Sequence, residues 1–127
     1  MQLLTTRVRL AVAAVCEIAD RPMTSLASTH ALADRFGVCR RYFEVPLQAL
    51  RRAGLLEGVR GPSGGYRLAR PAAEISVLDI LRALEPPETD ALPAALFYAC
   101  EKFLAELGRI SVADLRERDP ARLDLVA

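Results

Sequence analysis

The chain has 127 residues, of which 52% are hydrophobic and 26% are charged. This length suits one compact domain with an appended element, and it excludes the class of multidomain enzymes. It contains no apolar run of about 18 residues, no signal-peptide pattern and no regular cysteine framework, so we expect a cytoplasmic protein that neither spans a membrane nor is secreted. The net charge of +1 hides two unequal parts: residues 1–70 carry 11 Arg and 5 acids, and residues 71–127 carry 6 basic residues and 11 acids. The first part therefore suits a polyanion.

The first predicted element is a helix that begins near residue 6. Thr5 or Thr6 precedes it as a candidate cap, and Pro22 ends it. Apolar residues recur along it at the spacing of one helix face, namely Val8, Ala11, Val12, Val15, Ile18 and Ala19.

Two further short helices follow in close succession. The second runs through Leu32 and Phe36 to Gly37, a residue suited to a helix C-terminus. The third covers 39–53 and ends at Gly54. Two short helices joined by a tight turn that contains Gly are typical of a helix-turn-helix.

The third helix is predicted to have two distinct faces. At about 100° per residue, its apolar face carries Phe43, Leu47 and Leu50. The opposite face is polar and carries Arg40, Arg41, Glu44, Gln48 and Arg51. This polar face is either the surface that reads DNA or an ordinary solvated helix surface.

A β-hairpin, or wing, is predicted next. The runs 55–59 and 66–69 favour strands, and the segment 60–65 between them is rich in turn residues. A Gly-rich segment can also cradle the phosphates of a nucleotide. That alternative would require a following helix with the Lys and Ser/Thr of a P-loop, and neither follows here.

Two similar segments, 75–80 and 110–115, each carry a Ser with an Asp three residues later, so each predicts a capping box and a helix start. Between them, Pro86, Pro87 and Pro93 bracket an acidic linker. A long helix follows, with a second apolar row at Phe97, Cys100 and Leu104. This surplus apolar surface predicts burial against a second copy of the chain, through a main stripe of Leu92, Leu96, Ala99, Phe103 and Leu107.

Several short runs carry a resemblance that extends over nearly the whole chain. They are Leu4-Thr5-Thr6-Arg7, Tyr42-Phe43-Glu44, Arg51-Arg52-Ala53-Gly54-Leu55, Val59-Arg60-Gly61-Pro62-Ser63-Gly64-Gly65-Tyr66-Arg67-Leu68-Ala69 and Ile110-Ser111-Val112-Ala113-Asp114-Leu115. Together they resemble the Rrf family of bacterial winged helix-turn-helix transcriptional regulators, of the IscR, NsrR and CymR type. The resemblance implies a mainly α fold with a two-stranded β wing and a long C-terminal dimerisation helix. It divides the chain into a DNA-binding domain, 1–84, and a linker with the dimerisation helix region, 85–127.

The same resemblance implies a repressor, not an enzyme, that binds double-stranded DNA as a homodimer on a palindromic operator. Bases would face Glu44, Arg40, Arg41 and Gln48. The minor groove would receive Arg60 with the wing-tip residues Ser63 and Gly64. Phosphates would be held by Thr6, Arg7 and Tyr42. These residue types suit the roles, since Arg bonds guanine edges, Glu accepts from cytosine, and Arg favours a narrow electronegative minor groove.

The linker departs from the pattern of the cluster-binding members, which carry three closely spaced cysteines there. Here 85–90 has none, and Cys16, Cys39 and Cys100 stand far apart, so we expect no iron–sulfur cluster, no metal and no other cofactor. The single histidine, His30, has no predicted partner and is interpreted as solvated surface.

Cys39 is a candidate redox thiol, because it lies at a helix N-terminus beside two arginines that favour the thiolate. The alternative is a capping position where Cys replaces Ser. An effector is left open between a thiol oxidant, a small molecule and a partner protein.

Pro46 is the second departure, since it removes one backbone hydrogen bond inside the third helix. The helix is therefore expected either to begin later or to kink beside Glu44. Loss of a regular reading helix would favour a different class of protein, a dimeric interaction module that has lost operator recognition.

Overall fold

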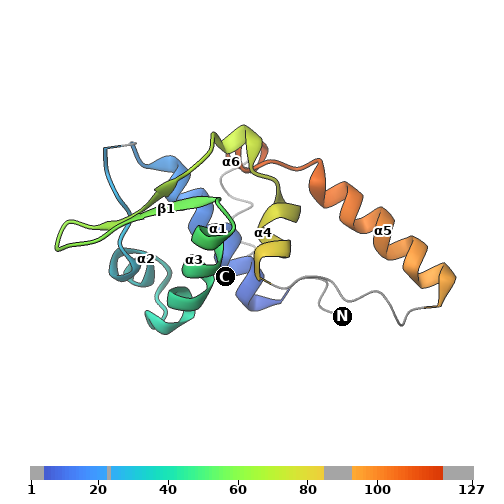
Figure 1. Ribbon diagram of the computed structural model, residues 1–127, viewed down its shortest axis with the longest axis horizontal. Coiled ribbons are helices and arrows are strands. Elements are labelled where there is room, and N and C mark those ends of the chain that lie inside the picture. The colour runs from blue at the N-terminus through green and yellow to red at the C-terminus, as the bar shows by residue number, and fades with distance from the viewer. Residues whose placement is uncertain (1–4, 23, 85–92, 119–127) are drawn as a thin grey trace.

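The computed structural model describes residues 5–22, 24–84 and 93–118 (Figure 1). In these ranges the chain is mainly helical, with one two-stranded antiparallel sheet, and the predicted winged-helix fold is confirmed. A short 3-10 turn, Ala72–Glu74, follows the sheet. The elements in chain order are α1 (Thr6–Asp20), α2 (Thr29–Phe36), α3 (Arg41–Arg52), β1 (Leu56–Val59), β2 (Gly65–Leu68), α4 (Val77–Leu84), α5 (Ala94–Gly108) and α6 (Val112–Arg118).

Local caps set the bounds of the first two helices. The hydroxyl of Thr5 accepts from the backbone N–H of Val8 at 3.2 Å, so Thr5 is the N-cap of α1. Ser28 caps α2 in the same way, and Gly37 ends it in the left-handed region at φ 66°. The predicted cap and stop signals of these helices are confirmed.

Helix α3 packs on the core through three side chains that are completely buried, Phe43, Leu47 and Leu50. The ring of Phe43 lies 5.9 Å from that of Phe36, which joins α3 to α2. The predicted division of α3 into a packed and a polar face is therefore confirmed.

Pro46 does not delay the start of α3. The helix begins at Arg41 and continues through Pro46 to Arg52, so the expectation of a later start is wrong. The fixed φ of proline is compatible with helix, but Pro46 lacks the N–H that would bond the Tyr42 carbonyl, and its ring crowds that carbonyl. Because the ring of Pro46 is buried with its neighbour Leu47, apolar burial offsets part of that loss.

The wing is fixed through β2 to the segment that leads into α2. β1 and β2 pair with Gly58 opposite Tyr66 and Val59 opposite Gly65. Ala27 adds a bridge, since its N–H donates to the Tyr66 carbonyl at 2.9 Å and its carbonyl accepts from the Tyr66 N–H at 2.8 Å. This third partner of the hairpin was not predicted from the sequence.

Both predicted capping boxes are present. In α4, Ser76 Oγ accepts from the Asp79 N–H, and Asp79 Oδ2 accepts from the Ser76 N–H, each at 3.0 Å. Ser111 and Asp114 repeat this geometry at the start of α6, with both distances again 3.0 Å.

The two capping segments also bind each other, which links the beginning of α4 to the beginning of α6. The Val77 N–H donates to the Ile110 carbonyl at 2.9 Å, and the Val112 N–H donates to the Ile75 carbonyl at 2.8 Å. The C-terminal end of α5 is therefore held against the start of α4, while the rest of α5 projects away from it (Figure 1).

Part of the apolar stripe of α5 is buried within the protomer, and part of it is exposed to solvent. Leu107 is only 8% exposed and packs into the intrachain core, so the protomer itself covers most of this side chain. Phe103 is half-buried against the same core, whereas Leu96 is 55% exposed and Ala99 is exposed. Leu92 lies outside the described residues. None of the described helices has the length and apolar character needed to cross a membrane.

Candidate nucleic-acid interface

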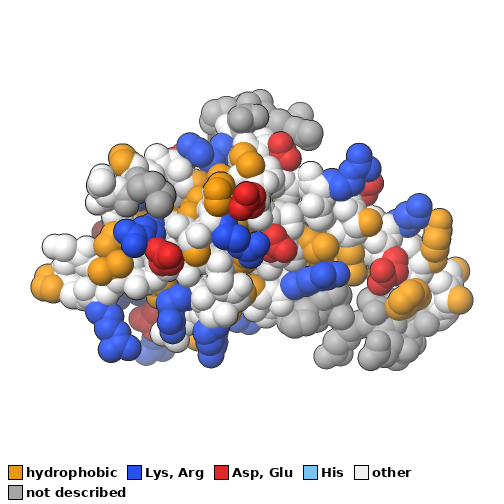
Figure 2. Space-filling view, turned by 45° about the horizontal axis from the view of Figure 1, so that its top comes forward, with side chains coloured by type: hydrophobic (Ala, Val, Ile, Leu, Met, Phe, Trp, Pro, Cys, Tyr) orange, Lys and Arg blue, Asp and Glu red, His pale blue; other side chains and the backbone are white. Residues whose placement is uncertain are grey.

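The outward face of α3 presents a row of polar side chains. Arg40 immediately precedes the helix, and Arg41, Glu44 and Gln48 are exposed along it. Tyr42 is 60% exposed. Since the opposite face is fixed in the core, these side chains project outward, and Figure 2 shows Lys and Arg side chains on the part of the molecule that carries α2, α3 and the wing.

A groove of about 530 Å³ lies between α3, the start of α2 and the wing. Three predicted site residues meet in it, Gln48, Arg60 and Gly64. In the part of the chain that the structure describes, neither Arg51 nor Arg60 forms an ion pair with a carboxylate. The full lining is Ser28, Thr29, Gln48, Arg51, Gly58, Val59, Arg60, Gly61, Gly64, Gly65 and Tyr66. Two unpaired guanidinium groups in an open groove suit an anion such as a phosphate.

The wing tip owes its shape to Gly64. A β-carbon at this position would collide with the backbone carbonyl oxygens of Val59 and Gly61, so no other residue fits the turn. Ser63 and Arg60 beside it are exposed. Gly64 therefore shapes the tip, and side-chain contacts would come from Arg60 and Ser63.

The remaining predicted contacts lie outside the groove. Thr6 and Arg7 are exposed on the first turn of α1, where the Thr6 hydroxyl accepts from Arg9 Nη2 at 3.3 Å. Arg41 and Tyr42 occupy the first turn of α3 and do not line the groove. The structure thus gathers the wing and the end of α3 at one place and leaves the predicted phosphate contacts separate.

Four groove residues with polar side chains were not among the predicted site residues. Ser28 and Thr29 reach the groove because the Ala27 bridge carries the start of α2 to the wing, and only the polar segment before α2 could have indicated them. Tyr66 and Arg51 were visible as a strand aromatic and as part of the polar helix face. Their meeting depends on how the hairpin folds back, which no local signal shows.

The three thiols occupy different environments. Cys39 is exposed in the turn before α3, and Cys100 is half-buried on α5. Cys16 is buried in α1, and burial raises the pKa of its thiol to about 11, with a further rise from Asp20 and an opposing effect of Arg116.

These environments predict selective alkylation. At pH 8, iodoacetamide is expected to modify Cys39 in the folded protein and to leave Cys16 unmodified, because the raised pKa lowers the thiolate fraction of Cys16 by about a hundredfold and its sulfur is covered. Peptide mass mapping with and without urea measures this. Equal labelling of both thiols without urea would show that the packing around α1 opens in solution.

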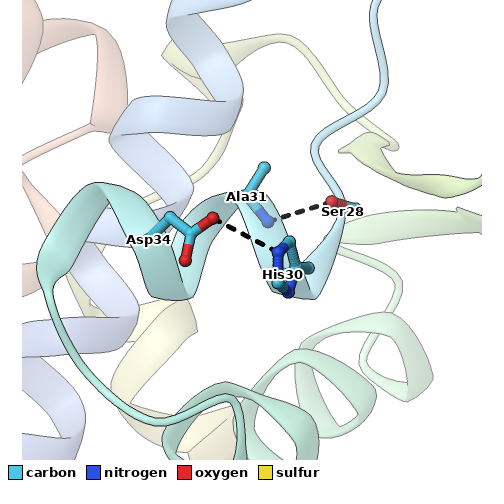
Figure 3. A network of polar contacts seen from close by, with 4 residues as sticks. All are labelled: Ser28, His30, Ala31 and Asp34. Carbon is cyan, nitrogen blue, oxygen red and sulfur yellow. Dashed lines mark hydrogen bonds and ion pairs between the residues drawn. The ribbon is translucent and has the colours of Figure 1, made fainter.

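His30 has an exposed acidic partner, which corrects its description as isolated. Its Nε2 lies 3.3 Å from Oδ2 of Asp34, one turn later on α2 (Figure 3). Ser28 Oγ accepts from the Ala31 N–H at 3.0 Å beside it. Both side chains of the His30 pair are more than 70% exposed, as expected for solvated surface.

Comparison with known proteins identifies the family. The profile described as Rrf2, iron-dependent transcriptional regulator, matches residues 4–96. The chain belongs to the Rrf2 family. Helix-turn-helix-type transcriptional regulators of Neisseria meningitidis serogroups A and B are 43% identical to it over 82 residues, which is 65% of this chain and 55% of each relative. The match thus spans about half the length of these relatives.

Solved Rrf2-type structures share the fold. CymR of B. subtilis, described as its global cysteine regulator, is 27% identical with a TM-score of 0.77, over 91% of this chain and 96% of that one. IscR of T. potens is 30% identical with a TM-score of 0.78, over 95% of this chain and 91% of that one. The expectation of a regulator rather than an enzyme is confirmed by the family.

The family's description mentions iron, but the described ranges contain no set of side chains suited to bind it. No group of three or more His, Cys, Asp or Glu residues comes together there in a way that could hold a metal ion. Cys16, Cys39 and Cys100 lie on α1, in the turn before α3, and on α5, and the covered, neutral thiol of Cys16 is a poor ligand. The described residues therefore do not fit an iron–sulfur cluster.

Proposed function

We propose that this Rrf2-family protein is a transcriptional repressor that binds a palindromic operator as a homodimer in the cytoplasm and does so without an iron–sulfur cluster. One observation carries the proposal: the polar face of α3 and the wing border the same groove, and no carboxylate among the described residues pairs with Arg51 or Arg60 there. A reading helix beside a wing is the arrangement that engages adjacent major and minor grooves.

In this proposal, Arg40, Arg41, Glu44 and Gln48 face bases in the major groove, while Arg60 and Ser63 enter the minor groove. Thr6, Arg7 and Tyr42 hold phosphates. Exposure of all these side chains supports the assignment. The continuity of α3 from Arg41 to Arg52 speaks against the alternative interaction module, whose support was damage to the helix by Pro46.

The dimer is proposed to form through the projecting part of α5. Its buried residues Leu104 and Leu107 pack on the protomer, and the same side of the helix continues to Leu96 and Phe97, which are 55% and 41% exposed. Hydrophobic side chains at the far end of α5 are visible in Figure 2. Residues 1–84 then bind DNA, and 85–127 join the copies, with the end of α5 sharing the core of 1–84.

Selection of bound duplexes from a random pool tests the readout. The wild type is expected to select two inverted half-sites. Glu44→Ala should relax preference at major-groove positions, and Arg60→Ala at narrow, A·T-rich positions, each by about 1–3 kcal/mol at the affected base pairs. If both variants weaken all sequences equally, these residues only position the protein. A wild type that enriches no sequence would contradict the operator proposal.

A further inference from the structure

Arg51 lies against the wing at a place where the wing has no side chain. A β-carbon on Gly58 would come within 3.2 Å of Arg51 Cδ and 3.5 Å of Cε1 in the Tyr66 ring. Gly58 and Tyr66 are opposite each other in the hairpin. The aliphatic stem of Arg51 and the Tyr66 ring therefore border the space that a side chain at position 58 would fill, and glycine keeps that space free.

Backbone hydrogen bonds join two of the segments that line the groove around Arg51, the wing and the start of α2. Tyr66 exchanges two backbone hydrogen bonds with Ala27, and Ser28 caps α2 directly after it. The wing and the start of α2 are thereby joined on one side of the groove, and Arg51 belongs to the last turn of α3 on the other. Its guanidinium has no carboxylate partner in the described ranges, so its charge is available to a ligand.

The position of Arg51 along α3 indicates the ligand. Helix-turn-helix proteins read bases with the N-terminal part of the recognition helix, whereas Arg51 is one residue from the end. A helix in the major groove and a wing in the adjacent minor groove have one sugar–phosphate backbone between them. The space between α3 and the wing is where that backbone passes, and a guanidinium there meets phosphate oxygens.

We propose that Arg51, kept in place beside Gly58, is a positioning residue that binds a DNA backbone phosphate in the groove between α3 and the wing. The inference rests on the proposed DNA-binding function. This contact fixes the wing relative to the reading helix on the duplex, and it carries no base preference of its own.

Arg51→Met tests the charge, because methionine keeps an apolar stem beside Gly58 and Tyr66 and removes the guanidinium. Affinity for a selected duplex is expected to fall about tenfold, with the same base preferences. The slope of log affinity against log salt should become shallower by about 0.9, the value for one phosphate contact. Arg52→Met is the matched control, since Arg52 is the exposed neighbour on α3 that does not line the groove.

Gly58→Ala tests the position, because it keeps the charge and places a methyl group against the Arg51 stem. It should weaken binding in the wild type and have no further effect in the Arg51→Met background, which is the coupling expected of two residues that act on one contact. Thermal unfolding of each variant checks that it is folded. If Gly58→Ala does not fold, the affinity and salt slope of Arg51→Met test the proposal without it.

Three outcomes separate the claims. A wild type with salt-sensitive duplex binding and an unchanged slope in Arg51→Met would overturn the role of Arg51 and leave the proposed function intact. A loss of DNA affinity in Arg51→Met equal to that in Arg52→Met would also overturn it, since removal of any positive charge from this surface would then have the same effect. Absence of duplex binding by the wild type at low salt would instead contradict the proposed function.

Discussion

Leu96→Asp is expected to yield a folded monomer with about 10²–10⁴-fold weaker binding to a duplex that carries two half-sites. Leu96 is 55% exposed in the protomer, so the substitution leaves the intrachain core intact. In the proposed dimer, it places an unpaired charge in a dry interface. A monomer binds only one half-site at a time, so it loses the added affinity that a dimer gains from binding two linked half-sites. This loss is the source of the large effect.

Tyr98→Asp is the matched control for the dimer. Tyr98 is two residues from Leu96, about 200° around the helix, and is 63% exposed beside Lys102. This variant is expected to remain dimeric. Sedimentation velocity measures both proteins, and circular dichroism confirms that both are folded. A dimeric Leu96→Asp would place the interface elsewhere, and a monomeric Tyr98→Asp would show that the opposite side of α5 is the surface covered.

Features encoded by neighbouring residues could be predicted from the sequence. The Ser and Asp of each capping segment bond within four residues, and the left-handed Gly37 follows its helix directly. The apolar face of α3 also follows from a local period, so Phe43 and Leu47 are buried as expected. For the site, this was enough to find the polar face of α3 and the wing.

Features that join distant segments could not be read in this way. Nothing near Ala27 indicates that it pairs with Tyr66, yet that bridge brings the start of α2 into the groove. The two capping segments were recognised as repeats, but their hydrogen bonds to each other depend on the path of α5 between them. The burial of Leu107 within the protomer was not predicted for the same reason, because a surplus apolar stripe does not reveal which part of it the protomer covers.

Pro46 shows the converse, a local rule that tertiary packing overrides. The cost of a missing helix hydrogen bond was correctly attached to this residue, but the sequence does not show that its ring is buried with the core of α3. The helix therefore runs from Arg41 to Arg52 where local reasoning expected a later start or a kink beside Glu44, and of these two only the later start is excluded.

Gly65→Ala is expected to release the wing from Ala27, because the approach of the Ala27 backbone leaves no room for a side chain. A β-carbon there would lie 2.7 Å from the carbonyl carbon and oxygen of Ala27 and 2.8 Å from the Ser28 nitrogen, all of them backbone atoms that cannot rotate away. The wing must then separate from Ala27 and lose both hydrogen bonds to Tyr66. Two such bonds and the backbone strain at φ 156° together amount to about 2–4 kcal/mol of unfolding free energy.

Gly37→Ala provides the comparison for that loss. Gly37 also has a positive φ of 66°, but a β-carbon there would meet nothing within 4 Å, so only the conformational cost of about 1 kcal/mol is expected. Urea denaturation measures both free energies, and duplex binding measures the groove. Since the Ala27 bridge joins two walls of the groove, Gly65→Ala should also lose DNA affinity, while Gly37→Ala retains it. Equal stability losses in the two variants would mean that the bridge contributes little, and normal DNA binding by Gly65→Ala would show that the groove does not need it.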